Sequence, residues 1–397
     1  MKVLYLTHRL PYAPNRGDRI RSYHLLEGLR REAEVTLVSL VHDDEEASHV
    51  ADVESRGVPV IAARTAGVSR WAGAALALAG TTPLTHALLD APGLASRVDA
   101  LARTLRPDVV VAFCSGMAQF AVRQAFDGVP FVLDMVDVDS EKWKDLGAIT
   151  GFPKGWVYRR EARVLSAFER AASERAVTAL VVNDKERAAL TRIAPGADVR
   201  TLPNGIDIDD FTPPGPPAAG STVVFCGVMN YAPNEAGAVW LAREVWPRVV
   251  AAHPAARLEF VGSQPSAAVR ALATDGIVVT GAVPHTRDHL WRAAVAVAPL
   301  HTARGLQNKV LEALAAGVPV VTTPAVRSGL PDALAPACDV ADAAEAFADA
   351  IIARLRQTPA ERRARATSVD LTPYSWQGPR RAFVDVVRAA AAISARR

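Results

Sequence analysis

The sequence has 397 residues, which is too long for one ordinary hydrophobic core and predicts two domains of about 200 residues each. Half of the residues are apolar and 22% are charged, the composition of a soluble globular protein. The 45 Lys and Arg residues barely outnumber the 42 Asp and Glu residues, and the net charge of +3 excludes the strongly basic surface of a nucleic-acid-binding protein.

Targeting and membrane signals are weak along the chain. Residues 2–6 form a strand pattern rather than a charged segment followed by a long apolar one, so we expect no secretory leader. The most apolar segment, residues 71–80, is about half as long as a membrane-spanning helix. Cys114, Cys226 and Cys338 are odd in number and far apart, which favours a reducing compartment. We therefore expect a cytoplasmic protein, and residues 71–78 either touch the inner face of the cytoplasmic membrane or form a buried helix.

Short apolar runs separated by helical patterns predict an α/β protein with parallel sheets covered on both faces. In the first domain, residues 1–208, the expected strands are residues 3–6, 35–41, 58–61, 109–113, 131–133 and 179–182. Residues 209–220 are rich in proline and glycine and predict a linker. The second domain, residues 221–375, repeats the pattern with strands at residues 223–226, 258–261, 277–280, 295–298 and 318–322.

Residues 376–397 predict a C-terminal helix, and packing back on the first domain is one alternative for it. Two doubly wound, Rossmann-like domains are then expected to face a central cleft. Open α/β sheets bind their ligands at the carboxyl ends of the strands, so the sequence places the binding residues in the loops that follow them.

The amino-terminal loop and an acidic segment follow two strands of the first domain. Gly17 permits close approach of the backbone, and Arg16 and Arg19 flank it. Asp137 and Asp139 lie after the strand at residues 131–133. These carboxylates are candidates for hydrogen bonds to a substrate or for loop capping, with a divalent cation as the less favoured alternative.

The most informative segment is residues 304–321, after the strand at residues 295–298. A helix is expected to begin near Gly305 and to end at Gly317. Lys309 and Glu312 share one face of this helix near its start, where free N–H groups suit an anion such as a diphosphate. Lys309 adds positive charge, and Glu312 can accept hydrogen bonds from ribose hydroxyls. The alternative is a surface ion pair, which the flanking buried strands disfavour.

This segment resembles the signature of the retaining GT-B glycosyltransferases, the family that includes sucrose synthases and bacterial mannosyltransferases. In that family two Glu residues, separated by seven residues, precede an Ala-x-Gly-x-Pro-Val-Val strand. Glu312 matches the second, which implies a nucleotide-ribose contact, whereas Arg304 stands in place of the first. The departure implies a different donor sugar or an extra cation for the diphosphate.

Other motifs are similar to the same family and occur in its order. Residues 225–234 resemble a Gly-x-Met-x-x-x-Pro-Asn motif that begins at Gly227. The Arg and Lys that most relatives place there are missing, which assigns the diphosphate to Arg304 and Lys309, the catalytic candidates together with Glu312. Residues 280–284 resemble a nucleobase loop that binds through backbone atoms, here near Val283.

The resemblance extends the donor-binding set to Gly17, Gly305 and Leu306, and places Arg16, Arg19, Asp137 and Asp139 on the acceptor side. Residues 11–22, 134–143 and 305–312 together resemble the sugar transferases of exosortase and exopolysaccharide gene clusters.

The resemblance implies transfer of a sugar from a nucleotide diphosphate sugar to an acceptor hydroxyl, with retention and without a metal ion or other cofactor. The expected acceptor is a lipid-linked saccharide in exopolysaccharide or cell-surface glycan assembly. Two alternatives remain: a nucleotide-sugar 2-epimerase of the same architecture, and a non-catalytic nucleotide-sugar-binding scaffold.

Overall fold

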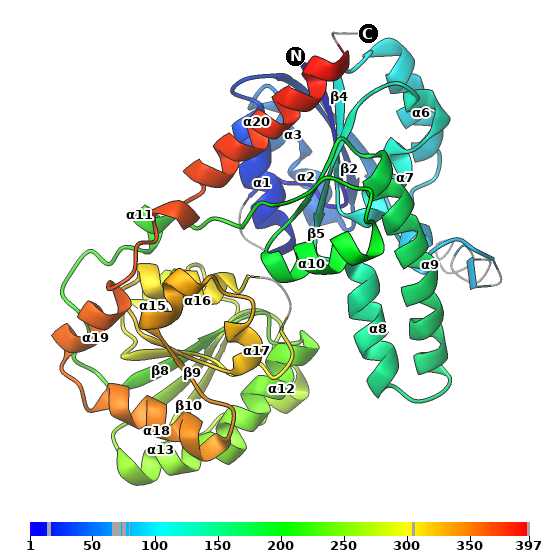
Figure 1. Ribbon diagram of the computed structural model, residues 1–397. Coiled ribbons are helices and arrows are strands. Elements are labelled where there is room, and N and C mark those ends of the chain that lie inside the picture. Colours follow the sequence, from blue (N-terminus) through cyan, green and yellow to red (C-terminus); the bar gives the residue numbers. More distant parts are fainter. Residues whose placement is uncertain (14–16, 66–72, 74–76, 79, 304–305, 395–397) are drawn as a thin grey trace. The chain divides into compact units, whose positions relative to one another are not determined.

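The computed structural model in Figure 1 describes residues 1–397 except 14–16, 66–72, 74–76, 79, 304–305 and 395–397. The chain divides into two compact units. The first contains residues Met1–Pro203 and Gln377–Arg397, and the second contains residues Asn204–Trp376. The C-terminal helix α20 (Gln377–Ser394) therefore belongs to the first unit, although it follows the second in the sequence.

The first unit is built on a parallel sheet of seven strands in the order β3-β2-β1-β4-β5-β6-β7. The order reverses between β1 and β4, which is the position where doubly wound sheets open a crevice at their carboxyl ends. The strands are β1 (Lys2–Thr7), β2 (Glu34–Val41), β3 (Val60–Arg64), β4 (Val109–Phe113), β5 (Phe131–Val136), β6 (Thr178–Val181) and β7 (Val199–Thr201).

Helices cover both faces of this sheet. They are α1 (Gly17–Leu29), α2 (Asp44–Ser48), α3 (Val50–Glu54), α5 (Leu84–Leu88), α6 (Leu94–Thr104), α7 (Ser115–Ala121), α8 (Asp139–Ile149), α9 (Lys154–Arg175), α10 (Asp184–Ile193) and α20, with a 3-10 turn η1 (Gln124–Phe126).

Alternate side chains of β1 enter separate cores. Val3 and Tyr5 pack in the core that contains residues of α1 and α20, while Leu4 and Leu6 pack in the core that contains residues of α6, α7, α9 and α10. This division follows from the two-residue period of a strand that is buried on both faces. Phe383 and Val387 of α20 are fully buried in the first of these cores, beside α1 (Figure 1).

The second unit has a parallel sheet of six strands in the order β10-β9-β8-β11-β12-β13, the arrangement of a dinucleotide-binding fold. The strands are β8 (Thr222–Cys226), β9 (Arg257–Val261), β10 (Ile277–Gly281), β11 (Val295–Ala298), β12 (Val320–Thr322) and β13 (Cys338–Val340). The α-helices are α11 (Ile208–Phe211), α12 (Ala232–Trp240), α13 (Trp246–Ala252), α14 (Ala267–Arg270), α15 (Arg287–Leu290), α16 (Asn308–Ala315), α17 (Pro324–Arg327), α18 (Ala344–Leu355) and α19 (Pro359–Ala366). Shorter turns are the π-helix η2 (Leu241–Val245) and the 3-10 turns η3 (Asp332–Ala337) and η4 (Thr372–Tyr374).

The two ends of the second unit lie against each other. The Ile206 N–H donates to the Tyr374 carbonyl at 2.7 Å, and the Trp376 N–H donates to the Ile206 carbonyl at 3.3 Å. Gly205 is required by this contact, because a Cβ atom there would lie 2.7 Å from the backbone nitrogen of Trp376. The structure therefore uses this glycine for the close approach of two chain segments.

All eleven expected strands are present, and the differences lie at edges and boundaries. The edge strands β7 and β13 have only three residues each and were not predicted. The proline-rich segment 209–220 is part of the second unit rather than a free linker, since Arg362 donates to the carbonyls of Ala218 and Gly220. The chain passes between the units at Pro203–Asn204 and at Trp376–Gln377.

A buried ion pair joins three elements of the first unit. The Arg21 guanidinium on α1 donates to both carboxylate oxygens of Asp134 on β5, at 2.8 and 2.7 Å, and to the Leu202 carbonyl at 2.9 Å. Arg21 is 2% exposed and Asp134 is fully buried. A bidentate geometry with a further acceptor compensates for the loss of water by both charges.

We expect Arg21→Met to lower the free energy of unfolding by about 3–5 kcal/mol, because it leaves the Asp134 carboxylate buried without its bidentate partner. The matched control is Arg187→Met. Arg187 forms an ion pair with Asp184 at 3.1 Å and is 51% exposed, so its loss should cost less than about 1 kcal/mol. Urea unfolding of both variants, followed by circular dichroism, measures the difference, and equal losses would contradict an anchoring role for Arg21.

Candidate functional site

Lys309 connects three elements at the carboxyl edge of the second sheet. Its ammonium group on α16 donates to the Asn234 side-chain oxygen on α12 at 2.9 Å. The Asn234 amide nitrogen donates to the Val228 carbonyl, after β8, at 2.9 Å, and the Lys309 nitrogen lies 4.7 Å from the centre of the Phe225 ring. Lys309 is the only lysine between residues 204 and 376 of the sequence, where all other permanent cations are arginines. A compact, mobile cation is thus placed where β8 ends.

Glycines line the same edge of the sheet. A Cβ atom on Gly227 would lie 2.8 Å from the Asn234 amide nitrogen and 3.2 Å from the Lys309 nitrogen. Gly262, after β9, has a φ of 143°, and a Cβ atom there would lie 1.9 Å from the Gly227 carbonyl oxygen. The Gly262 N–H donates to the carbonyl of Gly281, at the end of β10, at 3.2 Å. Backbone atoms rather than side chains therefore form this surface.

Gly227 was predicted as a binding residue, and the structure places it beside Lys309. The sequence analysis included Asn234 as the last residue of the motif that begins at Gly227 but gave it no role, and it missed Gly262. The signal for Gly262 was available, because Gly262 directly follows a predicted strand, where glycine permits close backbone approach.

The charged forms of Lys309 and Glu312 are both disfavoured by their surroundings. Burial raises the pKa of Glu312 to about 7, with Lys309 opposing the shift. Burial lowers the pKa of Lys309 to about 8, with Cys226 and Glu312 opposing it. Both side chains are partly buried on the same face of α16. A ligand that brings negative charge to Lys309 and hydroxyl donors to Glu312 would stabilise their charged forms.

The start of the Lys309 helix differs from the prediction. The helix begins at Asn308, three residues later than expected near Gly305, while Gly317 ends it with a φ of 73° as predicted. Leu306 is 7% exposed and packs in the core of the second unit. Arg304 and Gly305 lie outside the described residues.

Val283 lies in the loop after β10 and packs, partly buried, against the core of the second unit. The structure brings Gly227, Lys309 and Asn234 together and places Glu312 one turn further along α16.

The predicted loop of the first unit is held by a carboxylate that sequence reasoning missed. Glu46 on α2 is fully buried and accepts hydrogen bonds from the backbone N–H groups of Leu10, at 3.0 Å, and His42, at 2.8 Å. Arg9 donates to it at 3.4 Å, and the Arg19 Nε atom lies 3.6 Å away. Glu46 stands 36 residues after Leu10, so no local motif signals this contact.

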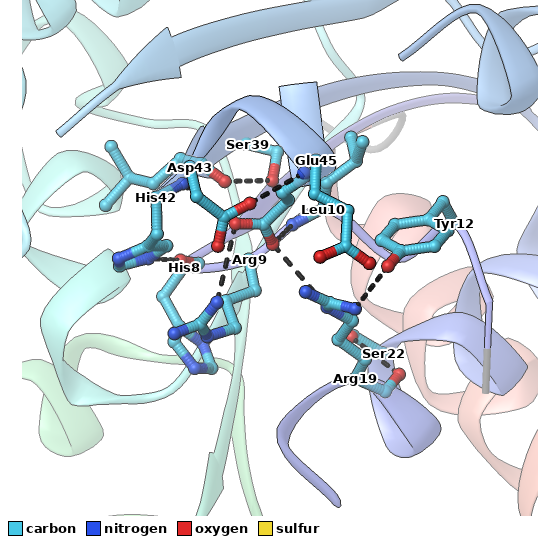
Figure 2. Close-up of polar contacts among 12 residues, drawn as sticks. His8, Arg9, Leu10, Tyr12, Arg19, Ser22, Ser39, His42, Asp43 and Glu45 are labelled. Atoms are coloured by element: carbon cyan, nitrogen blue, oxygen red, sulfur yellow. Dashed lines mark hydrogen bonds and ion pairs between the residues drawn. The ribbon is translucent and has the colours of Figure 1, made fainter. Parts of the chain in front are cut away.

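Arg19 points into this cluster (Figure 2). Its guanidinium donates to the Tyr12 hydroxyl at 2.7 Å and lies 4.5 Å from the centre of the Tyr12 ring. Arg19 is only 6% exposed, and in this structure it fixes the loop. Gly17 is the first residue of α1, and Arg16 lies outside the described residues.

The acidic segment lies at the strained end of β5. Val136 and Cys114, at the ends of the neighbouring strands β5 and β4, have φ angles of 69° and 67°, which are unfavourable for residues with a Cβ atom. Asp139 accepts a hydrogen bond from the Ser115 hydroxyl at 3.1 Å. Burial raises the pKa of Asp137 to about 7, and repulsion from Glu186 and Asp139 adds to the shift. Two carboxyl groups thus lie beside distorted backbone, as in many substrate-binding sites.

Within the described ranges, no group of three His, Cys, Asp or Glu residues is arranged to hold a metal ion.

Comparison with known proteins identifies the class of enzyme. A family model described as a glycosyl transferase 4-like domain matches residues 17–205, and a model described as glycosyl transferases group 1 matches residues 220–357. Each match falls on one of the two compact units. The chain is built from the two domains of a glycosyltransferase.

Solved structures show that this glycosyltransferase has the GT-B fold. HepE of Anabaena, in complex with UDP and glucose, matches with a TM-score of 0.67 at 13% identity, over 98% of this chain and 100% of that one. The UDP-forming trehalose-phosphate synthase of Burkholderia xenovorans gives 0.64 at 14% identity, over 98% and 99%. A glycosyltransferase of Rickettsia africae gives 0.63 at 10% identity, over 98% of each chain. No curated protein matches the glycosyltransferase in sequence.

None of the glycosyltransferase helices that the structure describes is long and apolar enough to cross a bilayer. Residues 71–78, expected either to touch a membrane or to form a buried helix, lie mostly outside the described residues. Within it, Ala77 is buried and its carbonyl accepts a hydrogen bond from Arg160.

The glycine contacts predict a graded series of stability losses. Gly262→Ala should lower the free energy of unfolding by more than about 3 kcal/mol, since its Cβ would collide with the fixed Gly227 carbonyl. Gly227→Ala should cost about 1–3 kcal/mol, because its Cβ meets side chains that can move. Gly276→Ala meets no atom within 4 Å and is the control. Thermal unfolding that ranks these variants differently would contradict the packing described here.

Proposed function

We propose that this glycosyltransferase transfers a sugar from a nucleotide diphosphate sugar to an acceptor hydroxyl, with retention at the anomeric carbon. The observation that carries the proposal is the position of Lys309, a single lysine held by Asn234 at a glycine-lined strand end with Glu312 one turn away. The fold neighbour HepE is described in complexes with UDP and with UDP-glucose, which supports a nucleotide diphosphate as the donor's leaving group.

The proposed roles follow from charge and geometry. The bond between the anomeric carbon and the diphosphate oxygen breaks, and the leaving diphosphate gains negative charge. Lys309 stabilises that charge, and Gly227 lets backbone atoms approach the phosphates. Glu312 accepts hydrogen bonds from the ribose hydroxyls. The acceptor oxygen forms the new bond on the same face of the sugar, and its proton passes to a donor phosphate oxygen.

The remaining assignments rest on the sequence motifs. Asp137 and Asp139 of the first unit accept hydrogen bonds from the acceptor, and Arg304 contributes a second cation near the diphosphate. We assign the enzyme to exopolysaccharide or cell-surface glycan assembly, with a lipid-linked saccharide as acceptor at the inner face of the cytoplasmic membrane. Because Lys309 and Arg304 supply the positive charge, no metal ion is required.

A screen of nucleotide sugars tests the donor class directly. One nucleotide diphosphate sugar should raise the unfolding temperature, since a ligand at 100 times its dissociation constant stabilises the folded state by about 2.7 kcal/mol. The same compound should support product formation in excess EDTA, and nuclear magnetic resonance of the product should show the donor's anomeric configuration. Absence of stabilisation by every uridine, guanosine, adenosine and thymidine diphosphate sugar would reject the proposed function.

Donor affinity should be highest between about pH 7 and pH 8, the pKa values of Glu312 and Lys309. Below this range Glu312 becomes protonated and loses acceptor capacity, and above it Lys309 loses its charge. Glu312→Gln should remove the fall in donor affinity at acid pH, and Lys309→Met should remove the fall at alkaline pH. Each should weaken binding at least about tenfold, because a hydrogen bond to a charged group contributes about 1.5–3 kcal/mol.

Isothermal titration of the donor between pH 6 and pH 9 measures both falls in affinity. Glu345→Gln on α18 is the matched control, since Glu345 is exposed and should leave the profile unchanged. A flat profile in the wild-type enzyme, or unchanged affinity in folded Glu312→Gln, would remove these side chains from the donor site.

A further inference from the structure

Helices α8 and α9 form an antiparallel hairpin that extends from the sheet of the first unit (Figure 1). Its base is fixed by the buried Glu169 carboxylate, which accepts a hydrogen bond from the Ser140 N–H at 3.1 Å. Along its length the rings of Trp143 and Tyr158 lie 5.3 Å apart. The hairpin is therefore packed along its whole length.

Glycines bring the two helices together near the tip. A Cβ atom on Gly147 would lie 2.9 Å from the Arg159 side chain, whose guanidinium donates to the Gly147 carbonyl at 2.9 Å. A Cβ atom on Gly155 would lie 1.9 Å from the Thr150 carbonyl oxygen. The turn between the helices is thus tightly constrained and presents its side chains in fixed positions.

The tip exposes large apolar side chains. Phe152 is 86% exposed, Ile149 is 83% exposed and Trp156 is 51% exposed. These are the most exposed large apolar side chains in the described part of the chain, and they lie within eight consecutive residues. Such a concentration of exposed apolar side chains indicates an interaction site.

Lysine residues, which are rare in this protein, are concentrated on the α8–α9 hairpin. The sequence contains only six lysines, and three of them, Lys142, Lys144 and Lys154, are on this hairpin. All three are exposed, as are Arg159 and Arg163 of α9, whereas Asp145 is the only exposed carboxylate between residues 142 and 163, all of which the structure describes. Exposed aromatic residues flanked by cations on both helices match an anionic bilayer surface, where rings enter the interface and ammonium groups reach the phosphates.

We propose that the tip of the α8–α9 hairpin docks on an anionic lipid bilayer through Ile149, Phe152 and Trp156, with Lys144 and Lys154 contacting the headgroups. Charge complementarity favours lipid over a second copy of the chain, whose corresponding tip would carry the same positive charge. The short turn limits insertion to the interface. The tip contains none of the residues assigned to the donor or the acceptor, so its test is independent of the proposed function.

Vesicle binding by the full chain tests the proposal. The protein should co-sediment with vesicles of phosphatidylcholine and phosphatidylglycerol, and should bind at least tenfold more weakly to phosphatidylcholine alone or in 0.5 M salt. On binding, tryptophan emission should shift to shorter wavelength. Trp156→Phe should abolish that shift while largely preserving co-sedimentation, because phenylalanine still inserts. Co-sedimentation that is independent of phosphatidylglycerol would overturn the proposal.

Variants then locate the surface. Phe152→Ser should weaken partitioning about tenfold, equivalent to about 1.4 kcal/mol, and Lys144→Glu/Lys154→Glu should weaken it further in low salt. The controls are Val340→Ser, at a position 47% exposed in the second unit, and Lys185→Glu, on exposed α10. Equal vesicle binding by tip and control variants would overturn the proposal. So would wild-type self-association that Phe152→Ser abolishes without any change in lipid binding, since the tip would then be a protein interface.

Discussion

The first unit depends on one buried charge pair. Arg21 is on α1, the helix that follows β1, and Asp134 is on β5, one strand beyond the reversal between β1 and β4. Their bidentate contact ties α1 to β5 and, through Leu202, to the segment after β7. The register of α1 determines where Arg19 meets Glu46, and the end of β5 determines where the backbone distorts at Val136. The proposed acceptor residues follow directly after that distortion. A hydrophobic pair could fill the same volume, but it would not fix the orientation of α1 and its distance from β5 in the same way.

In the second unit, glycine residues leave the space in which the site forms. Gly227 and Gly262 allow two strand exits to touch through their backbones, and the space left by Gly227 is the space that Lys309 and Asn234 occupy. The Lys309 ammonium group therefore fits at this position because the neighbouring glycine has no Cβ atom. Burial then shifts the pKa values of Lys309 and Glu312 toward neutrality, so a bound anion can change their charge state.

The sequence predicted the architecture well because buried parallel strands are long apolar runs. It failed where packing, rather than pattern, defines an element. β7 and β13 are short edge strands, one of which contains Arg200 and the other Asp339, so neither forms an apolar run. The proline-rich segment was expected to be a linker, because the distant Arg362 that holds it could not be seen in a local window.

The candidate site was predicted unevenly for the same reason. Lys309 and Glu312 share a helix and could be paired from their spacing. Asn234 is 75 residues from Lys309, and Glu46 is 36 residues from Leu10, so tertiary folding alone brings them together. The exposed tip of the hairpin was also missed, since Phe152 and Trp156 are equally compatible with a buried helix until neighbouring elements fail to cover them.

The contact between Ile206 and Tyr374 has an evolutionary consequence. Because the second unit begins and ends at adjacent points, its removal would leave two chain ends that a short peptide could join. Such modules can be exchanged between genes by recombination without threading a new chain through the host sheet. Exchange of the second unit would then replace the residues proposed to bind the donor and leave the proposed acceptor residues, Asp137 and Asp139, and the packing of α20 unchanged.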